Sequence, residues 1–135
     1  MEDSTLSELF WAVARRLRHL NRETLDPLNI APSHGRALAV LMRHGPVRPG
    51  ALAEHLRIAA RSATEVVDDL ERRGLVERGP DPGDRRATLV TLTPAGKAAG
   101  ERIRAARHAE AERFFGALDP RERAELTRLL RKLRD

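Results

Sequence analysis

The fold of this chain is decided by residues 52–94, which read LAEHLRIAARSATEVVDDLERRGLVERGPDPGDRRATLVTLTP. Apolar residues at helical spacing predict two short helices in this region, at residues 51–56 and 60–73. A connection of about four residues around Ile58 joins them, and Gly74 is placed to cap the second helix at its C-terminus. Two short helices in close succession, the second of them amphipathic, form a helix-turn-helix.

Behind these helices the apolar residues begin to alternate, which is typical of strands. Residues 75–78 predict one strand and residues 87–93 predict the returning strand. Residues 79–84 between them are rich in Gly, Pro and Asp and predict the turn. A hairpin directly behind a helix-turn-helix makes a winged helix, so we expect a mainly α fold with a small β-hairpin.

Outside this stretch the apolar spacing predicts four further helices, at residues 5–22, 32–44, 94–116 and 120–134. Residues suited to N-caps precede three of them: Ser4 or Thr5, Thr93, and Asp119 with Glu122 in the capping-box position. Leucine stripes run along the first and last helices, at residues 6–20 and 126–133. Such stripes need a partner surface, which is either a second copy of the chain or another helix of the same chain.

Length and composition limit the class of protein. The 135 residues suffice for one compact domain, and with 33% charged and 41% hydrophobic residues the chain is expected to fold. Its apolar runs are far shorter than the roughly 20 residues of a membrane span, and its first residues do not resemble an export signal. The absence of cysteine excludes disulfides and thiolate zinc sites. We therefore expect a cytoplasmic protein without membrane contact.

The charge favours a polyanionic partner. The formal net charge is +5, and Lys97 and Lys132 are the two lysines among 25 basic residues, which leaves 23 arginines. Arginine binds phosphates and guanine edges well. Coding at high GC content also enriches arginine, so the charge alone leaves both explanations open.

Five segments, in this order and spacing, resemble the MarR family of winged-helix transcriptional regulators. They are HGPVRP at residues 44–49, LAEHL at 52–56, VDDLERRGLV at 67–76, DPGDRR at 81–86 and VTLTPAG at 90–96. The resemblance extends over nearly the whole chain, from Leu6 to Leu133. It implies one domain over residues 1–135, with a winged helix-turn-helix lobe at 32–93 and dimerisation helices at 5–22 and 94–134.

The resemblance also implies a function. Proteins of this family are homodimers that bind double-stranded DNA at pseudo-palindromic operators, most often as repressors, and a small effector releases them. We therefore expect a sequence-specific, DNA-binding transcriptional regulator. The alternative is a winged-helix protein–protein interaction module without DNA binding.

A helix in the major groove contacts base edges with the side chains near its N-terminus. The residues expected to do so here are Arg61, Ser62, Thr64 and Glu65. The family often has a basic residue where Glu65 stands. Four acids outnumber three arginines in residues 60–73, which keeps the protein–protein alternative open. We interpret Asp68 and Asp69 as ordinary solvated charges.

The predicted hairpin turn provides a second DNA contact. By resemblance, Asp84 orients Arg86, which enters the minor groove, while Arg85 contacts phosphate or the groove. A solvated charged turn is the alternative. Arg48 and Arg57, beside the helix-turn-helix, are candidate phosphate contacts.

The resemblance places an effector cleft between the dimerisation helices and the winged lobe. Trp11 and Arg15 are neighbours on one helix face, with His19 one turn further, and an aromatic ring beside a guanidinium suits an aromatic carboxylate. His34, at the start of the second predicted helix, is the fourth candidate. The same residues can instead form a cation–π or salt-bridged patch of an interface.

Neither an enzyme nor a metal site is expected. The sequence has no Gly-rich phosphate loop, no G-x-S-x-G and no H-E-x-x-H. His108 and Glu112 share a helix face, but no second histidine joins them at that spacing. We therefore assign no catalytic residues, no metal ligands and no cofactor.

Overall fold

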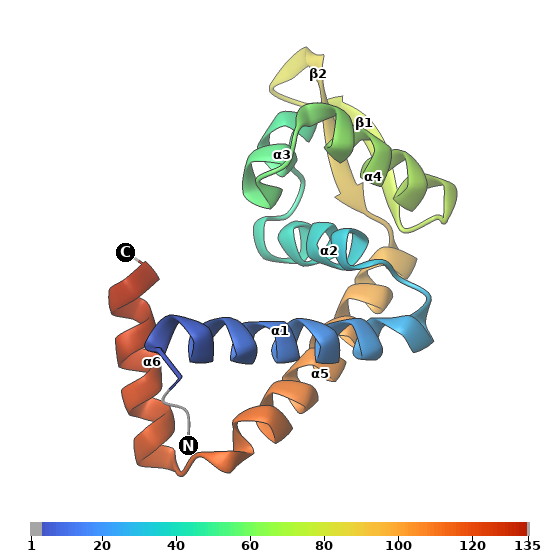
Figure 1. Cartoon of the computed structure of the whole chain (residues 1–135). Helices are drawn as coiled ribbons and strands as arrows, with labels where there is room; N and C mark the ends of the chain where they lie inside the picture. The colour runs from blue at the N-terminus through green and yellow to red at the C-terminus, as the bar shows by residue number, and fades with distance from the viewer. Residues whose placement is uncertain (1–3, 135) are drawn as a thin grey trace.

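The computed structural model describes residues 4–134. Over this part of the chain there are six α-helices, two short 3-10 helices and one antiparallel hairpin (Figure 1). In order, they are α1 (Leu6–Leu25), η1 (Asp26–Leu28), α2 (Pro32–His44), α3 (Pro49–Leu56), α4 (Ala60–Arg72), β1 (Val76–Asp81), β2 (Asp84–Leu92), α5 (Pro94–Phe114), η2 (Phe115–Ala117) and α6 (Pro120–Arg134). The predicted fold class, mainly α with a small hairpin, is confirmed.

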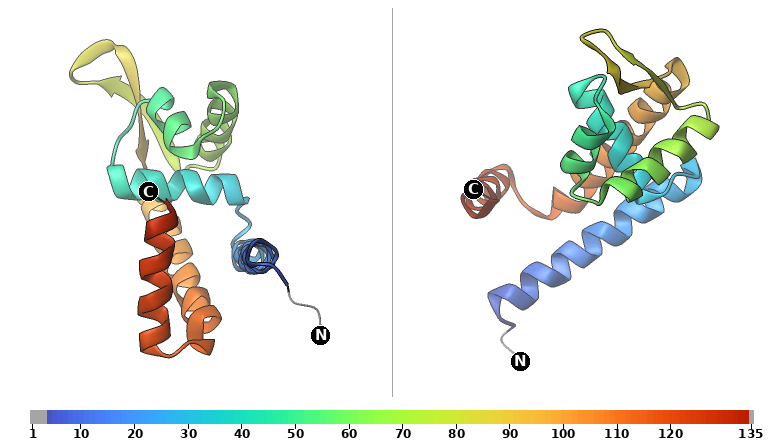
Figure 2. Two further views of the ribbon diagram at one scale, coloured as in Figure 1. Left: turned by 60° about the vertical axis from the view of Figure 1, so that its left-hand side comes forward. Right: turned by 90° about the horizontal axis from the view of Figure 1, so that it is seen from above.

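The molecule consists of a winged lobe and three helices that extend from it. The lobe contains α2, α3, α4 and the hairpin, while α1, α5 and α6 lie largely outside it (Figure 1, Figure 2). α5 begins directly after β2 and packs against both α1 and α2. The hairpin and α4 lie at the end of the molecule opposite to α1 and α6 (Figure 1).

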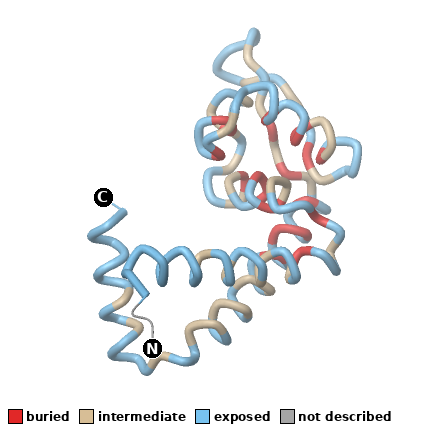
Figure 3. Tube along the Cα trace, in the orientation of Figure 1, coloured by how far each residue is buried: buried red, intermediate tan, exposed pale blue. Residues whose placement is uncertain are grey.

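The apolar core lies in the winged lobe and continues along the first turns of α5 (Figure 3). Its completely or almost completely buried side chains include Leu38, Leu52, Val67, Leu70, Val76 and Val90. α1 contributes one buried residue, Leu25, and α6 contributes none over the residues that the structure describes. A single chain therefore leaves most apolar side chains of its terminal helices uncovered.

The helix caps follow the prediction. Thr5 and Glu8 form a capping box at α1, with N···O distances of 3.2 Å in both directions. Asp119 and Glu122 form the same arrangement at α6, at 2.8 and 3.0 Å. Thr93 caps α5. Contacts between a side chain and nearby backbone amides thus set where these helices begin.

Two boundaries differ clearly from the prediction. α1 continues beyond residue 22 to Leu25, because this leucine is fully buried in the core. The hairpin turn is shorter than expected: β1 continues to Asp81, and only Pro82 and Gly83 connect it to β2. Gly and Pro favour a turn over all of residues 79–84, but pairing with β2 overrides this local preference as far as Pro80, where the register shifts.

Candidate nucleic-acid interface

α4 has one buried face and one exposed face. Its core-facing residues are Ala63, Val66, Val67 and Leu70. Because these follow the helical period, the residues between them near the start of the helix face solvent. They are Arg61, Ser62, Thr64 and Glu65, the predicted base contacts. The structure therefore brings all four onto one exposed surface.

The acids in the second half of α4 are bound within the lobe. Oδ1 of Asp68 and Oε1 of Glu71 accept hydrogen bonds from the guanidinium of Arg78 on β1, at 2.6 and 2.7 Å. Burial disfavours the charged form of Arg78, but these bonds outweigh burial and raise the pKa of Arg78. The interpretation of Asp68 as an ordinary solvated charge is therefore wrong, because it ties α4 to the hairpin.

Asp69 is bound as well. It accepts a hydrogen bond from Arg72 at 2.9 Å, and its Oδ2 lies 2.6 Å from Nε2 of His34 on α2. The bond from Arg72, and then that from His34, lowers the pKa of Asp69. Among the acids of α4, only Glu65 lacks a partner in the part of the chain that the structure describes. The acidic residues that kept the protein–protein alternative open are thus mostly paired within the lobe.

The tip of the hairpin carries two arginines, Arg85 and Arg86, whose side chains have no partner among the described residues. The register shifts after Pro80, so that Asp81 pairs with Asp84 and residues 85–87 bulge out of the pairing. Oδ1 of Asp84 accepts a hydrogen bond from the backbone amide of Arg86 at 3.0 Å. Asp84 therefore acts on Arg86 through its main chain, and the side chain of Arg86 remains exposed.

The two candidate phosphate contacts differ in availability. Arg57 follows α3 in the left-handed conformation, with φ 55°, and its guanidinium has no partner among residues 4–134. Arg48 donates two hydrogen bonds to the carboxylate of Asp81. Arg57 is therefore free to bind phosphate, whereas the guanidinium of Arg48 is already engaged.

All these elements lie at one end of the molecule. Figure 1 shows α4 on the side of the lobe away from α1 and α6, with the hairpin projecting beyond it. A winged helix uses this combination of an exposed helix and a projecting hairpin to contact the major groove and its neighbouring backbone or minor groove. The geometry suits double-stranded DNA.

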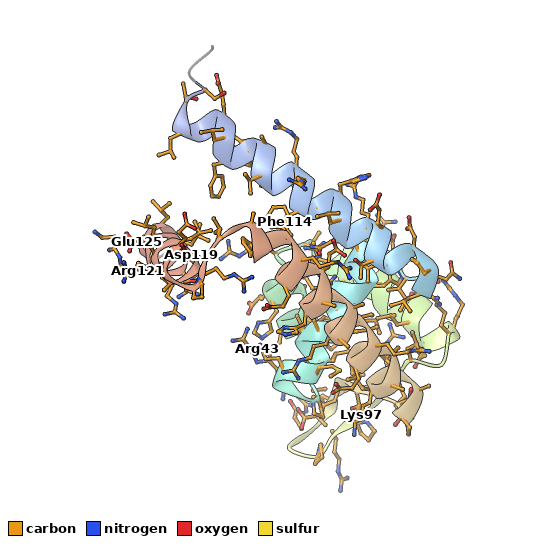
Figure 4. The ribbon with its side chains drawn as sticks, turned by 90° about the horizontal axis from the view of Figure 1, so that it is seen from below. Arg43, Lys97, Phe114, Asp119, Arg121 and Glu125 are labelled. Atoms are coloured by element: carbon orange, nitrogen blue, oxygen red, sulfur yellow. The ribbon has the colours of Figure 1, made fainter. Side chains whose placement is uncertain are left out.

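A cationic cavity that sequence reasoning missed lies between α2 and α5. It has a volume of about 500 Å³, and its apolar lining includes Met42 and Ile103. Its charged lining is three arginines and one acid, Arg43, Arg104, Arg107 and Glu101, so positive charge predominates. Figure 4 shows Arg43 on α2 beside α5. Spacing along α5 places Arg104 and Arg107 on one face, but nothing in the sequence reveals that α2 packs against this face.

Arg107 is the least solvated cation of this cavity. Its Nε is buried and has no hydrogen-bond partner over residues 4–134. Burial, and then the charge of Arg36, lowers the pKa of Arg107. A Cβ atom on Gly35 would lie 3.2 Å from Nη2 of Arg107, so the absence of a side chain at Gly35 gives the guanidinium its room. A half-buried guanidinium whose Nε lacks a hydrogen-bond partner among these residues is suited to an anionic ligand.

The four predicted effector residues are not brought together. Trp11 and Arg15 lie on the first half of α1, where Trp11 is 55% exposed. His19 forms an ion pair within α1, and His34 contacts α4. His34 lies near the C-terminal end of α1. Along the axis of α1, that end is about 20 Å from Trp11, at a rise of roughly 1.5 Å per residue. None of the four lines the cavity between α2 and α5 in this chain.

Residues 4–134 contain neither a candidate metal site nor a candidate membrane span. No group of three or more His, Cys, Asp or Glu side chains there could hold a metal ion. None of the helices in this range combines the length and the apolar composition needed to cross a bilayer.

Similar sequences extend over most of the chain. The model of the MarR family matches residues 28–87. An uncharacterized HTH-type transcriptional regulator of Mycobacterium bovis is 36% identical over 120 residues, which cover 88% of this chain and 80% of that protein. The HTH-type transcriptional repressor NicR of Pseudomonas putida is 34% identical over 98 residues, covering 73% of this chain and 62% of that protein.

Solved structures are similar over the same range. A mutant of MarR from E. coli in complex with operator DNA has a TM-score of 0.82 and 29% identity, covering 95% of this chain and 92% of that chain. BpsR of Bordetella bronchiseptica, whose DNA binding is regulated by 6-hydroxynicotinic acid, has a TM-score of 0.82 and 27% identity, covering 98% and 94%. The similarity therefore includes the terminal helices as well as the winged lobe.

Proposed function

Because the chain belongs to the MarR family of transcriptional regulators, which are DNA-binding proteins and not enzymes, we propose that it is a dimeric repressor released from its operator by a small aromatic anion. One observation carries the DNA-binding part of this proposal. At the exposed end of the lobe, Arg61, Arg85 and Arg86 have no partner within the described residues, while the nearby acids of α4, Glu65 excepted, are bound. A regulator of this kind acts on DNA, and we therefore propose that the protein is located in the cytoplasm of a bacterial cell.

The proposed contacts divide between the two grooves. Arg61, Ser62, Thr64 and Glu65 read base edges from α4. Arg86 enters the minor groove, with Arg85 beside it and Asp84 holding the backbone. Arg57 contacts phosphate. Arg48 was grouped with Arg57 on sequence position, but its bonds to Asp81 point to a different role.

Arg86→Ala tests the DNA-reading assignment. The duplex is selected from a random library with the immobilised protein, and a pseudo-palindrome with half-site centres about 10 base pairs apart is expected. Losing one contact per protomer is expected to weaken binding by about 2–6 kcal/mol per dimer, at least tenfold, at roughly 1–3 kcal/mol per contact. Arg102→Ala, on the exposed face of α5, is the matched control. If Arg86→Ala binds as tightly as wild type, the wing is only a solvated turn.

The dimer is supported by apolar surface that one chain leaves open. Leu6 is 83% exposed and Leu133 is 76% exposed, at the two ends of the chain. Between α1, α5 and α6 lies a groove of about 660 Å³, whose apolar lining includes Phe10, Phe115, Leu126 and Leu130. Exposed apolar surface on this scale marks an interaction site. A second copy is the proposed occupant, because a two-fold operator requires two lobes.

The effector is proposed to bind in the cavity between α2 and α5. The unpartnered guanidinium of Arg107 would receive the carboxylate, and Met42 and Ile103 would contact the ring. The cavity touches both the lobe and α5, so an occupant can change the angle between the lobe and the helices that hold it. The surface patch formed by Trp11, Arg15 and His19 is the alternative location, without His34.

Benzoate serves as the probe for both locations. Its binding is measured by calorimetry, and operator release is measured in parallel for Arg107→Ala and Arg15→Ala. The proposal expects that Arg107→Ala loses benzoate binding and release while Arg15→Ala keeps both. The reverse pattern would move the effector site to the Trp11–Arg15 patch.

A further inference from the structure

We propose that Arg48 is a positioning residue that fastens the wing to the start of α3 before DNA is bound. This inference deepens the proposed function, and it rests on the proposal that the wing contacts the minor groove of DNA. It assigns to Arg48 a role different from the phosphate contact that its position in the sequence suggests. The role follows from three sets of contacts around the hairpin turn.

One guanidinium holds both ends of the turn. Nε and Nη2 of Arg48 donate hydrogen bonds to Oδ2 of Asp81 at 3.0 and 2.9 Å. Nη2 also lies 4.0 Å from Oδ2 of Asp84. Asp81 and Asp84 pair across the turn formed by residues 82 and 83, so the charge of Arg48 offsets two carboxylates that face each other.

The carboxylate of Asp81 is itself held in place. Its Oδ1 accepts a hydrogen bond from the backbone amide of Gly83 at 2.8 Å, and its side chain is only 17% exposed. The bond from Gly83, and then that from Arg48, lowers the pKa of Asp81. Asp81 therefore stays ionised and links Arg48 to the backbone of the turn.

The segment that carries Arg48 is anchored to the other strand. Val47 and Val90 exchange backbone hydrogen bonds, with N···O distances of 3.2 and 2.8 Å. Arg48 is also the residue before α3, the first helix of the helix-turn-helix. The contact between Arg48 and Asp81 thus joins the helix-turn-helix to the tip of the wing, and it fixes where Arg85 and Arg86 stand relative to α4.

This arrangement lowers the cost of ordering the wing on DNA. Without the contact, the wing samples more conformations in the free protein, and binding must restrict them. An exposed ion pair of this kind is worth little by itself, so its loss in both protomers is expected to weaken operator binding by roughly three- to tenfold.

The salt dependence of binding separates a positioning residue from a phosphate contact. Arg48→Ala should weaken binding while leaving the slope of log affinity against log salt unchanged. Arg57→Ala, the matched control with a free guanidinium, should flatten the slope by roughly 1.8 per dimer, because two phosphate contacts are lost. A similar flattening with Arg48→Ala would overturn the proposal.

A double-mutant cycle with Asp81→Asn gives a second test. Asparagine keeps an oxygen for the amide of Gly83 but removes the charge that holds Arg48. The double variant Arg48→Ala/Asp81→Asn should bind DNA no more weakly than Arg48→Ala alone, since both changes break one contact. If Asp81→Asn instead binds more tightly and with a steeper salt slope, Arg48 is a phosphate contact that Asp81 restrains, and the proposal is wrong.

A measurement without DNA keeps this inference separate from the proposed function. In ¹⁵N relaxation experiments, the heteronuclear NOE of the amides of Gly83 and Arg86 should fall in Arg48→Ala, with an unchanged thermal midpoint. Unchanged wing dynamics would refute the positioning role. If the NOE falls but Arg86→Ala has no effect on DNA binding, the positioning role stands and the wing contact with DNA fails.

Discussion

At the scale of single residues, Gly96 allows α5 to approach the base of the hairpin closely, because glycine has no side chain. A Cβ atom on Gly96 would lie 1.9 Å from the carbonyl oxygen of Leu75 and 3.1 Å from the side chain of Leu92. Thr93, three residues earlier, donates a hydrogen bond to the carbonyl oxygen of Gly74 at 2.6 Å, which holds the two segments together. Because the first obstacle is backbone, no rotamer change can make room at Gly96.

Gly96→Ala is therefore expected to lower the free energy of unfolding by about 3 kcal/mol, the upper part of the range for overpacking. Gly50→Ala is the matched control, because no atom lies within 4 Å of a Cβ built at Gly50 in α3. That change should be neutral or stabilising by at most roughly 1 kcal/mol. Urea unfolding of the two variants measures both values. Equal stability of Gly96→Ala and wild type would contradict the close approach of α5 to Leu75.

At the scale of elements, side-chain pairs connect α4 to its neighbours around the core. Arg78 on β1 binds two acids of α4, and His34 at the start of α2 binds Asp69. The buried face of α4 supplies most of the stability, while these polar pairs determine its orientation. α4 is thus held on two sides by contacts that depend on ionised carboxylates.

The contact of Asp69 predicts a specific pH dependence. Its folded pKa is lowered from 3.8, so its contribution to stability is complete well above that value and is lost as the pH falls through the folded pKa. Asp69→Asn should unfold at lower urea concentration than wild type at pH 6, and the difference should shrink between pH 5 and pH 3. Glu65→Gln, which removes an acid without a partner, should differ little from wild type at pH 6. A difference for Asp69→Asn that is constant down to pH 3 would show that the ionised pair does not contribute.

At the scale of the whole molecule, the buried core is confined largely to the winged lobe and the first turns of α5. The lobe has its own buried cluster, whereas α6 has no buried residue in the described range. Phe114 near the end of α5 receives Arg16 of α1 over its ring, at 5.4 Å from the centroid, so α1 is held partly by a cation–π contact (Figure 4). The remaining apolar side chains of the terminal helices form the surface at which we propose that a second copy binds.

Removal of the residues after Asp119 should therefore leave an aggregated or unfolded chain, because α6 and its half of the dimer surface are lost. In the full-length chain, Leu133→Glu should shift the dimer toward monomer in light scattering after size-exclusion chromatography. Lys97→Glu, at the far end of α5 from α6 (Figure 4), should leave the dimer intact. A soluble, folded monomer after truncation would contradict the proposed role of the terminal helices.

The elements of this protein could be predicted from its sequence because their signals are local. Caps such as Thr5 and Asp119 act on amides within three residues, and apolar periods repeat within one or two turns. The order of helices and hairpin indicated a winged helix without knowledge of any long-range contact. Even the hairpin was located correctly, although its turn proved shorter than the Gly and Pro content suggested.

Only the tertiary structure decided which arginine side chains are bound by acids of the same chain. Arg48 and Arg57 look equivalent in the sequence, yet Arg48 is bound to Asp81, 33 residues away, and Arg57 has no partner within the part of the chain that the structure describes. The cavity beside Arg107 is likewise lined jointly by α2 and α5, which are distant in the sequence. Pairing between distant charges depends on how whole elements pack, and that packing is set by the entire core rather than by any local window. The sequence therefore determined the elements and the class of partner, and the packing determined which arginines are available to bind it.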